Sequence, residues 1–150
     1  MNRLSPLLVL TLLTAACADF PRDPDNTLKR VERQGSFRVG LVEPLDEAGS
    51  GPDVDALLQR IGAASHASPK LVRGGAEPLL SKLEDGELEL VIGRFEKKSP
   101  WAPLVTIGPP LRKQRQGKVE FHLAPVMRNG ENAWIALVER EVRNLAPEAG

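Results

Sequence analysis

The feature that most constrains the fold is a regular alternation of short apolar strands with amphipathic helices in the first two thirds of the chain. Three apolar runs are typical of strands, at residues 36–42, 70–73 and 88–92. Two patterns of helical spacing lie between them, at residues 53–63 and 76–85. Strands that alternate with helices usually pair in parallel, because the crossover helix carries the chain back to the same end of the sheet. The pattern predicts an α/β fold with a mostly parallel sheet and helices on both of its faces.

Flanking residues extend this unit at both ends. A helix is expected to begin at Asn26 or Thr27 and to end at Gly35, with the side chain of Asp25 or Asn26 as its cap. Beyond the third strand we expect an extended segment at 103–108, a strand at 118–124, and a last helix from Asn129 or Gly130 to just before Pro147. Apolar residues of this last helix, among them Trp134, are expected in the core.

The amino-terminal residues have the pattern of an export signal. Arg3 supplies a positive charge, residues 4–13 are nearly all apolar, and small residues follow. Cys17 comes next and, as the only cysteine, cannot form an internal disulfide. This arrangement resembles the signal of bacterial lipoproteins, in which such a cysteine is acylated. It predicts a signal peptide at 1–16, an exposed tether at 17–25, and a periplasmic protein anchored to the outer membrane through lipidated Cys17. A soluble periplasmic protein is the alternative.

Charge balance and residue content exclude several classes of protein. The 20 basic residues match the 20 acidic residues without any block of like charge, so no nucleic-acid partner is expected. Aromatic residues make up 4% of the chain, which is few for stacking on bases or sugars. No GxSxG or HExxH motif, metal-ligand spacing or nucleophile–base pair is recognisable. We therefore expect no metal, no cofactor and no enzymatic activity, and a hydrolytic enzyme is the least favoured alternative.

Five short motifs follow one another along the chain. They lie at residues 27–31 with 35–40, at 51–55, at 86–93, at 99–102, and at 126–127 with 130–134. In this order they resemble solute-binding protein family 3, the periplasmic substrate-binding components of amino-acid-type ABC transporters. The resemblance covers residues 26–110 and 118–145. It implies a type II periplasmic-binding-protein-like fold.

The same resemblance implies that only one of two lobes is present. In that family a complete second lobe lies between the two matching stretches, whereas here a short linker at 111–117 joins them. The chain is therefore expected to form a single lobe over residues 26–145, followed by a tail at 146–150. Only one of the two lobes that close on the ligand in that family would then be present.

Candidate ligand-binding residues follow from the motifs, at Asp53, Asp55, Arg94 and Trp101. The two acids could bind a cation or a substrate amine, or could only offset the positive end of a helix dipole. The family commonly has an arginine that pairs with the ligand carboxylate at the position of Trp101, and an aromatic residue in the loop at 43–50. Neither is present here. These departures weaken the expectation that a free amino acid is captured by closure of two lobes.

Two binding functions remain compatible with these residues. The first is an exported, non-catalytic single-lobe module that interacts with an envelope protein or a transporter permease, attached to the membrane only by its lipid. The second is a functional component of a transport system that binds a small polar solute, such as an amino acid, and completes its site by dimerisation. In this second case the ligand would lie over the carboxyl ends of the strands.

Overall fold

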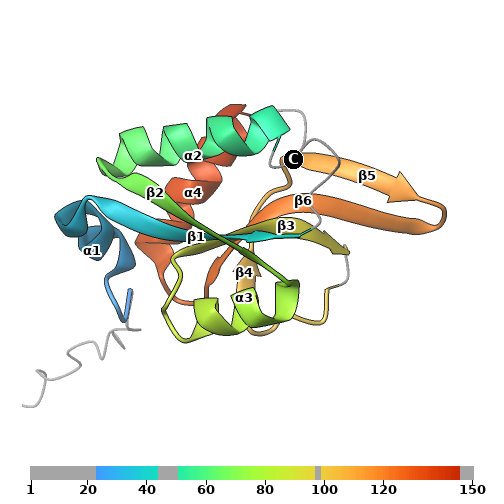
Figure 1. Cartoon of the computed structure of the whole chain (residues 1–150), viewed down its shortest axis with the longest axis horizontal. Helices are drawn as coiled ribbons and strands as arrows, with labels where there is room; N and C mark the ends of the chain where they lie inside the picture. The colour runs from blue at the N-terminus through green and yellow to red at the C-terminus, as the bar shows by residue number, and fades with distance from the viewer. Residues whose placement is uncertain (1–22, 44–50, 97–98, 146–150) are drawn as a thin grey trace, which may run out of the picture.

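The alternating pattern of the sequence is present in the computed structural model, which describes residues 23–43, 51–96 and 99–145 (Figure 1). Its helices are α1 (Thr27–Gln34), α2 (Gly51–Ser65), α3 (Ala76–Glu84) and α4 (Asn132–Leu145). Its strands are β1 (Ser36–Val42), β2 (Ser68–Gly74), β3 (Leu90–Glu96), β4 (Val105–Ile107), β5 (Arg112–Gln116) and β6 (Val119–Arg128). The export signal, Cys17 and the loop at 44–50 lie outside the described residues.

The described strands form one six-stranded sheet in the order β2-β1-β3-β6-β4, with β5 also paired to β6. β1 pairs in parallel with β2 on one side and with β3 on the other. β6 is antiparallel to β3, β4 and β5. Among the described strands, β6 thus runs against the other five, which all point the same way. The predicted α/β class and the mostly parallel sheet are confirmed.

Helices cover both faces of the sheet and enclose two apolar cores (Figure 1). On the face of α1, α2 and α4, the buried rings of Trp134 and Phe37 meet edge to face with centroids 5.6 Å apart. α3 covers the other face. Because successive side chains of a strand point to opposite faces, Leu90 and Ile92 belong to the first core and Val91 to the second. Trp134 is fully buried, as predicted.

β5 and β6 form a hairpin where the sequence indicated a linker at 111–117. Gln116 and Val119 are register partners, so only two residues, Gly117 and Lys118, reverse the chain. Gly117 has a φ of 63°, which glycine adopts without the steric cost that other residues carry there. In Figure 1 this hairpin projects beyond the rest of the sheet. The two halves of the lobe are therefore joined by paired strands and a tight turn.

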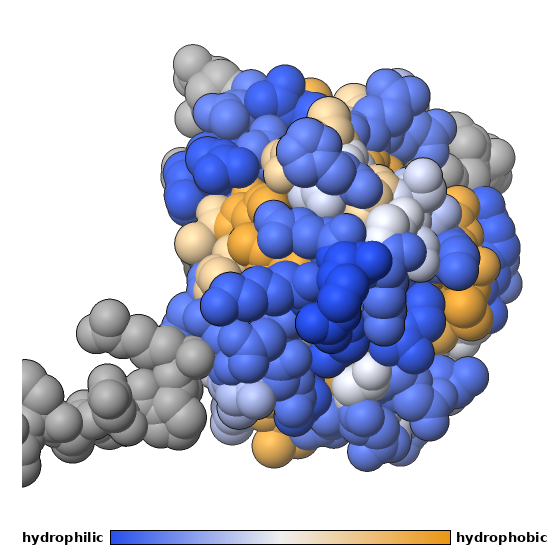
Figure 2. Space-filling model, turned by 90° about the vertical axis from the view of Figure 1, so that its left-hand side faces the viewer, coloured by the Kyte–Doolittle hydropathy of each residue, from blue (hydrophilic) through white to orange (hydrophobic). Residues whose placement is uncertain are grey.

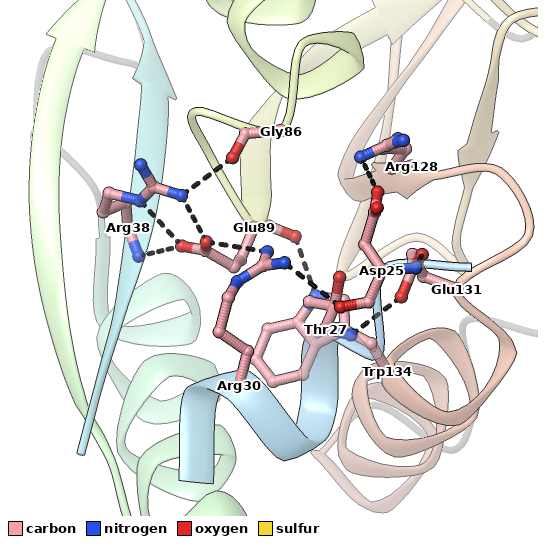
Figure 3. A network of polar contacts seen from close by, with 9 residues as sticks. All are labelled: Asp25, Thr27, Arg30, Arg38, Gly86, Glu89, Arg128, Glu131 and Trp134. Atoms are coloured by element: carbon pink, nitrogen blue, oxygen red, sulfur yellow. Dashed lines mark hydrogen bonds and ion pairs between the residues drawn. The ribbon is translucent and has the colours of Figure 1, made fainter. Parts of the chain in front are cut away.

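α1 lies at one end of the sheet, on a mostly hydrophilic face of the molecule (Figure 2). The expected cap of this helix by Asp25 or Asn26 is wrong. Asn26 makes no capping hydrogen bond, and the carboxylate of Asp25 pairs with Arg128. The buried carboxylate of Glu131 instead accepts hydrogen bonds from the backbone N–H groups of Asp25 and Thr27, each at 2.8 Å (Figure 3). Because Glu131 lies 104 residues from Thr27, no local pattern indicates this contact.

Candidate functional site

The candidate site lies where β3, β5 and β6 approach the start of α2. Arg94 of β3 and Arg112 of β5 are both register partners of Leu123 in β6, from opposite sides. Register partners project from the same face of a sheet. Leu123 belongs to the core under α2 and α4, so both arginines are on that face. We call Asp53, Arg94, Arg112 and Phe121 the carboxyl-end cluster, because β3 ends there.

Arg112 is held by the first turn of α2. Its Nη2 and Nε atoms lie 2.7 and 3.2 Å from Oδ2 of Asp53. The two side chains are 35% and 41% exposed, so the ion pair contributes at most about 1 kcal/mol to stability. Asp53 also lies at the positive end of the helix dipole. An amine that bound Asp53 would therefore have to compete with Arg112.

Arg94 has a different environment, because its guanidinium forms no hydrogen bond or ion pair with any described residue. Its Cζ atom lies 5.1 Å from the ring centroid of Phe121, which is a cation–π contact. Its Nε is buried and unpaired within the described part of the chain. Such a donor costs about 1–3 kcal/mol, and more when charged, so it calls for an explanation. A guanidinium with free N–H groups is suited to bind a carboxylate through two hydrogen bonds.

The other two predicted residues lie elsewhere. Trp101 packs against the core under α3, on the face of the sheet opposite to Arg94. Asp55 is exposed on α2 and lines a groove of about 460 Å³ between α2 and β2, together with Leu58 and Leu71. The structure thus places Asp53 and Arg94 on one face of the sheet and Trp101 on the other, while Asp55 lines the groove between α2 and β2. A role in binding for any of the four stays a prediction.

Sequence reasoning missed Arg112 and Phe121. The sequence pattern puts Arg112 in the linker at 111–117 and Phe121 on the strand at 118–124, and it indicates no partner for either residue. One signal was present, because glycine at the first of two turn residues, as in Gly117-Lys118, is typical of a two-residue hairpin, but residues 112–116 are all polar and lack the alternation that would indicate a strand. Pairing the residues on either side of that turn would have placed Arg112 opposite Leu123.

A second polar cluster lies at the opposite end of the sheet, beside α1 (Figure 3). Glu89 is 4% exposed, and its carboxylate accepts hydrogen bonds from the backbone N–H of Arg38 at 2.6 Å, from Nη2 of Arg38 at 2.5 Å and from Nη2 of Arg30 at 3.3 Å. Its backbone oxygen accepts one from the indole of Trp134 at 2.7 Å. The hydrogen bond to Glu89 raises the pKa of Arg38, although burial opposes this. Glu89 is thus paired on all sides, which indicates a structural role.

The described residues offer neither a cluster of metal ligands nor a membrane-spanning helix. No group of three or more His, Cys, Asp or Glu side chains in ranges 23–43, 51–96 and 99–145 is placed to hold a metal ion. Within the same ranges, none of the helices has the length and apolar character needed to cross a bilayer.

His122 lies away from the carboxyl-end cluster, on the face of the sheet opposite to Arg94. Its Nε2 atom lies 2.9 Å from Oε1 of Glu120.

Comparison with solved structures reveals a single fold. The arginine-bound form of domain 1 from TmArgBP superposes with a TM-score of 0.63 at 19% identity, covering 77% of this chain and 97% of that one. The ancestral amino-acid-binding protein AncCDT-1, a precursor of cyclohexadienyl dehydratase, gives 0.65 at 12% identity, with coverage of 81% and 94%.

A substrate-binding protein of an amino acid ABC transporter from Streptococcus pneumoniae, bound to L-arginine, gives 0.65 at 9% identity, with coverage of 81% and 92%. By sequence, no protein-family description and no curated protein matches the chain. At these identities the similarity concerns the fold. It confirms the expectation drawn from the motifs: the chain has the fold of one lobe of the amino-acid-binding proteins of solute-binding family 3.

Proposed function

We propose that this protein is a non-catalytic binding module of the bacterial cell envelope, which holds a small carboxylate-bearing solute on a single lobe. Arg94 is the observation that carries the proposal. Its guanidinium is held against Phe121, and its buried Nε has no partner among the described residues. A carboxylate would accept two charge-assisted hydrogen bonds from this group, and so would satisfy the donor that the protein leaves unpaired.

Related folds support binding by one lobe. Domain 1 of TmArgBP is described in an arginine-bound form, and this supports the proposal that one lobe of this fold holds a solute. The substrate-binding protein from S. pneumoniae is described with the same ligand. A single lobe leaves one side of the solute open, so we expect weaker binding here than between two closed lobes, unless a second copy or a permease covers the solute.

A non-catalytic role fits the chemistry of the carboxyl-end cluster. One of the compared proteins, AncCDT-1, is described as a precursor of a dehydratase. The cluster contains two arginines, a phenylalanine, and an aspartate already paired with Arg112. Arginine stays protonated at every physiological pH and so cannot act as a general base. The cluster is therefore suited to hold an anion and offers no unengaged acid–base group.

Location and attachment form the second half of the proposal. The apolar run at 4–13 followed by Cys17 supports export to the periplasm and attachment to the outer membrane by acylation. The tether at 17–25 would then place the lobe close to the membrane surface. Such an attachment suits a module that presents a solute to a partner in the envelope, and a transporter permease is one such partner.

The test is a titration of a fragment covering 18–150, which contains all described elements, with amino acids and simple carboxylates. Calorimetry should detect one ligand class, and Arg94→Gln should weaken its binding about 10- to 150-fold, since a hydrogen bond to a charged group contributes about 1.5–3 kcal/mol. Arg115→Gln is the matched control, because the side chain of Arg115 is exposed on β5 and forms no hydrogen bond or ion pair with a described residue. Arg94→Lys, which keeps the charge, covers the case in which Arg94→Gln fails to fold.

Equal affinity of wild type and Arg94→Gln for every ligand would rule out this site. The second candidate function, interaction with an envelope protein in the absence of a solute, would then be favoured. One observation favours it specifically. β2 is an edge strand of the described sheet, and its Leu71 and Val72 are 49% and 38% exposed. An exposed strand edge with apolar side chains can pair with a strand of another protein.

A further inference from the structure

A concave pocket lies at the amino ends of β1 and β2, at the opposite end of the strands from the carboxyl-end cluster. It encloses about 410 Å³, and its lining consists of Arg30, Gln34, Ser36, Arg38, Lys70 and Gly86. Figure 2 shows this end of the molecule, where hydrophilic residues cover most of the surface. Three of the six lining residues carry a positive charge, and none of the six carries a negative charge.

Two of the positive charges are immediate neighbours. Arg38 of β1 and Lys70 of β2 are register partners, so their side chains leave the same face of two strands that lie about 4.8 Å apart. Like charges in this position destabilise a sheet. Ser36 lies two residues earlier in β1 and therefore points to the same face. Arg30 reaches the pocket from α1.

The nearby acids do not neutralise this group. Glu89 is buried beneath the pocket and pairs with both Arg30 and Arg38 (Figure 3). Glu87 is exposed and acts on Arg38 only through a weaker attraction. The side chain of Lys70 forms no ion pair or hydrogen bond with any residue that the structure describes. Arg30 and Arg38 therefore share one buried carboxylate, and Lys70 has no counter-charge among the described residues, which leaves an excess of positive charge at the surface of the pocket.

Several residues that line the pocket have side-chain donors that no described residue uses. Arg38 donates to Glu89 and to the oxygen of Gly86 through Nε and Nη2, and its Nη1 has no partner among the described residues. The side chains of Gln34 and Ser36 likewise form no hydrogen bond within the described ranges. Glu89 holds Arg38 in position, so its free Nη1 is already oriented. The donors come from three elements, with those of β1 and β2 side by side on one face of the sheet and those of α1 beside them.

We propose that this pocket binds a phosphate-class oxyanion, with Arg38 and Lys70 as the principal ligands and Ser36 as a further donor. An oxyanion with several acceptor oxygens can bind donors from several directions at once, and arginine and lysine are the usual partners of phosphate. The bound anion would also offset the repulsion between the neighbouring positive charges of Arg38 and Lys70. The proposal uses no residue of the carboxyl-end cluster, so it does not depend on the function proposed above.

The oxyanion could be free phosphate or the headgroup of an anionic phospholipid. Asp23 lies six residues after Cys17, and its backbone N–H donates to the oxygen of Gly130, which fixes this point of the chain to the lobe. An extended chain of six residues spans at most about 21 Å. If Cys17 is acylated, Asp23 and the start of α1 would lie within about that distance of the membrane surface, so the pocket beside α1 can contact it. Both sources present the same chemical group to the pocket, and separate arms of one experiment distinguish them.

The first arm is a titration of the 18–150 fragment with inorganic phosphate, followed by amide chemical shifts at constant ionic strength. Saturable shifts are expected at residues 34–38 and 70, and Lys70→Glu should weaken binding at least tenfold. Lys70 is exposed on an edge strand, so this change should leave the core intact. Lys113→Glu is the matched control, since Lys113 is also exposed, on β5. Ser36→Ala, expected to weaken binding about threefold, covers the case in which Lys70→Glu fails to fold.

The second arm is cosedimentation with vesicles of phosphatidylcholine alone or with added phosphatidylglycerol. Binding that requires phosphatidylglycerol, is lost in Lys70→Glu and is displaced by phosphate would identify a headgroup as the source. Phosphate binding at the pocket without vesicle binding would identify free phosphate. The proposal is overturned if phosphate shifts no residue of the pocket, or if Lys70→Glu and Lys113→Glu weaken binding equally.

Discussion

Replacing Glu89 with glutamine should destabilise the protein more than any other change of similar size in the polar groups described. The carboxylate of Glu89 accepts one hydrogen bond from a backbone N–H and three from guanidinium groups. Glutamine keeps one of the two acceptor oxygens and turns an NH₂ group toward donors. Arg30 and Arg38 would then lose their counter-charge, and at least one donor would face another donor.

The expected loss follows from the exposure of the partners. Breaking a fully buried ion pair costs about 3–5 kcal/mol. The side chain of Glu89 is 2% exposed, but those of Arg30 and Arg38 are 23% and 43% exposed and can turn toward water. We therefore expect the free energy of unfolding to fall by about 2–3 kcal/mol, which lowers the melting temperature by roughly 6–12 °C for a domain of this size.

Urea unfolding followed by tryptophan fluorescence is the suitable assay. The indole of Trp134 donates to the backbone oxygen of Glu89 and reports directly on this region. Trp101→Phe removes the second tryptophan from the signal. Glu87→Gln is the control, since Glu87 is exposed two residues away, and its change should stay within about 0.5 kcal/mol. A loss below about 1 kcal/mol for Glu89→Gln would show that the arginines find equivalent partners in water, and would refute the reasoning.

Three further outcomes are expected. Burial raises the pKa of Glu141, but hydrogen bonds and attraction from Arg140 and Arg60 lower it overall below 4.5. The ionised carboxylate therefore stabilises the fold above that pH, and this stabilisation is lost as the pH falls below it. Glu141→Gln should flatten the fall in urea midpoint between pH 7 and pH 3.5, and an unchanged slope would contradict this. Gly117→Ala should lower the free energy of unfolding by about 1 kcal/mol through the positive φ alone, since no atom lies within 4 Å of the added Cβ. Gly117→Asn should recover most of this loss in the same urea unfolding experiment, because asparagine tolerates a positive φ. In cells, Cys17→Ser should abolish labelling by radioactive palmitate, whereas persistent labelling would place the lipid elsewhere.

Much of the fold could be predicted because it depends on local periodicity. The alternation of Phe37, Val39 and Leu41 indicated β1 and its buried face, and these residues do lie in one core. The end of a strand is less well marked, because apolar and charged residues both occur there. β3 therefore extends to Glu96, beyond the apolar run that identified it.

The parts that could not be predicted depend on contacts between distant residues. The cap of α1 by Glu131 bridges 104 residues, and the pairing of Arg112 with Asp53 bridges 59. Neither leaves a periodic pattern. Arg94 could be identified as a candidate from the resemblance, but its cation–π contact with Phe121 depends on the register between β3 and β6. Such a register is set by the packing of the whole sheet.

The turn at Gly117 and Lys118 also makes the chain a natural acceptor for inserted sequence. The ladder between β5 and β6 brings the two ends of this turn together whether or not anything is placed between them. Loop closure becomes only slowly less favourable with length, so a long insertion costs little more than a short one. A compact domain whose own ends lie close together could be grafted there, and the lobe would still fold. An insertion in the gene could replace this turn with a domain, and a deletion could replace such a domain with a turn, without loss of the fold of the lobe.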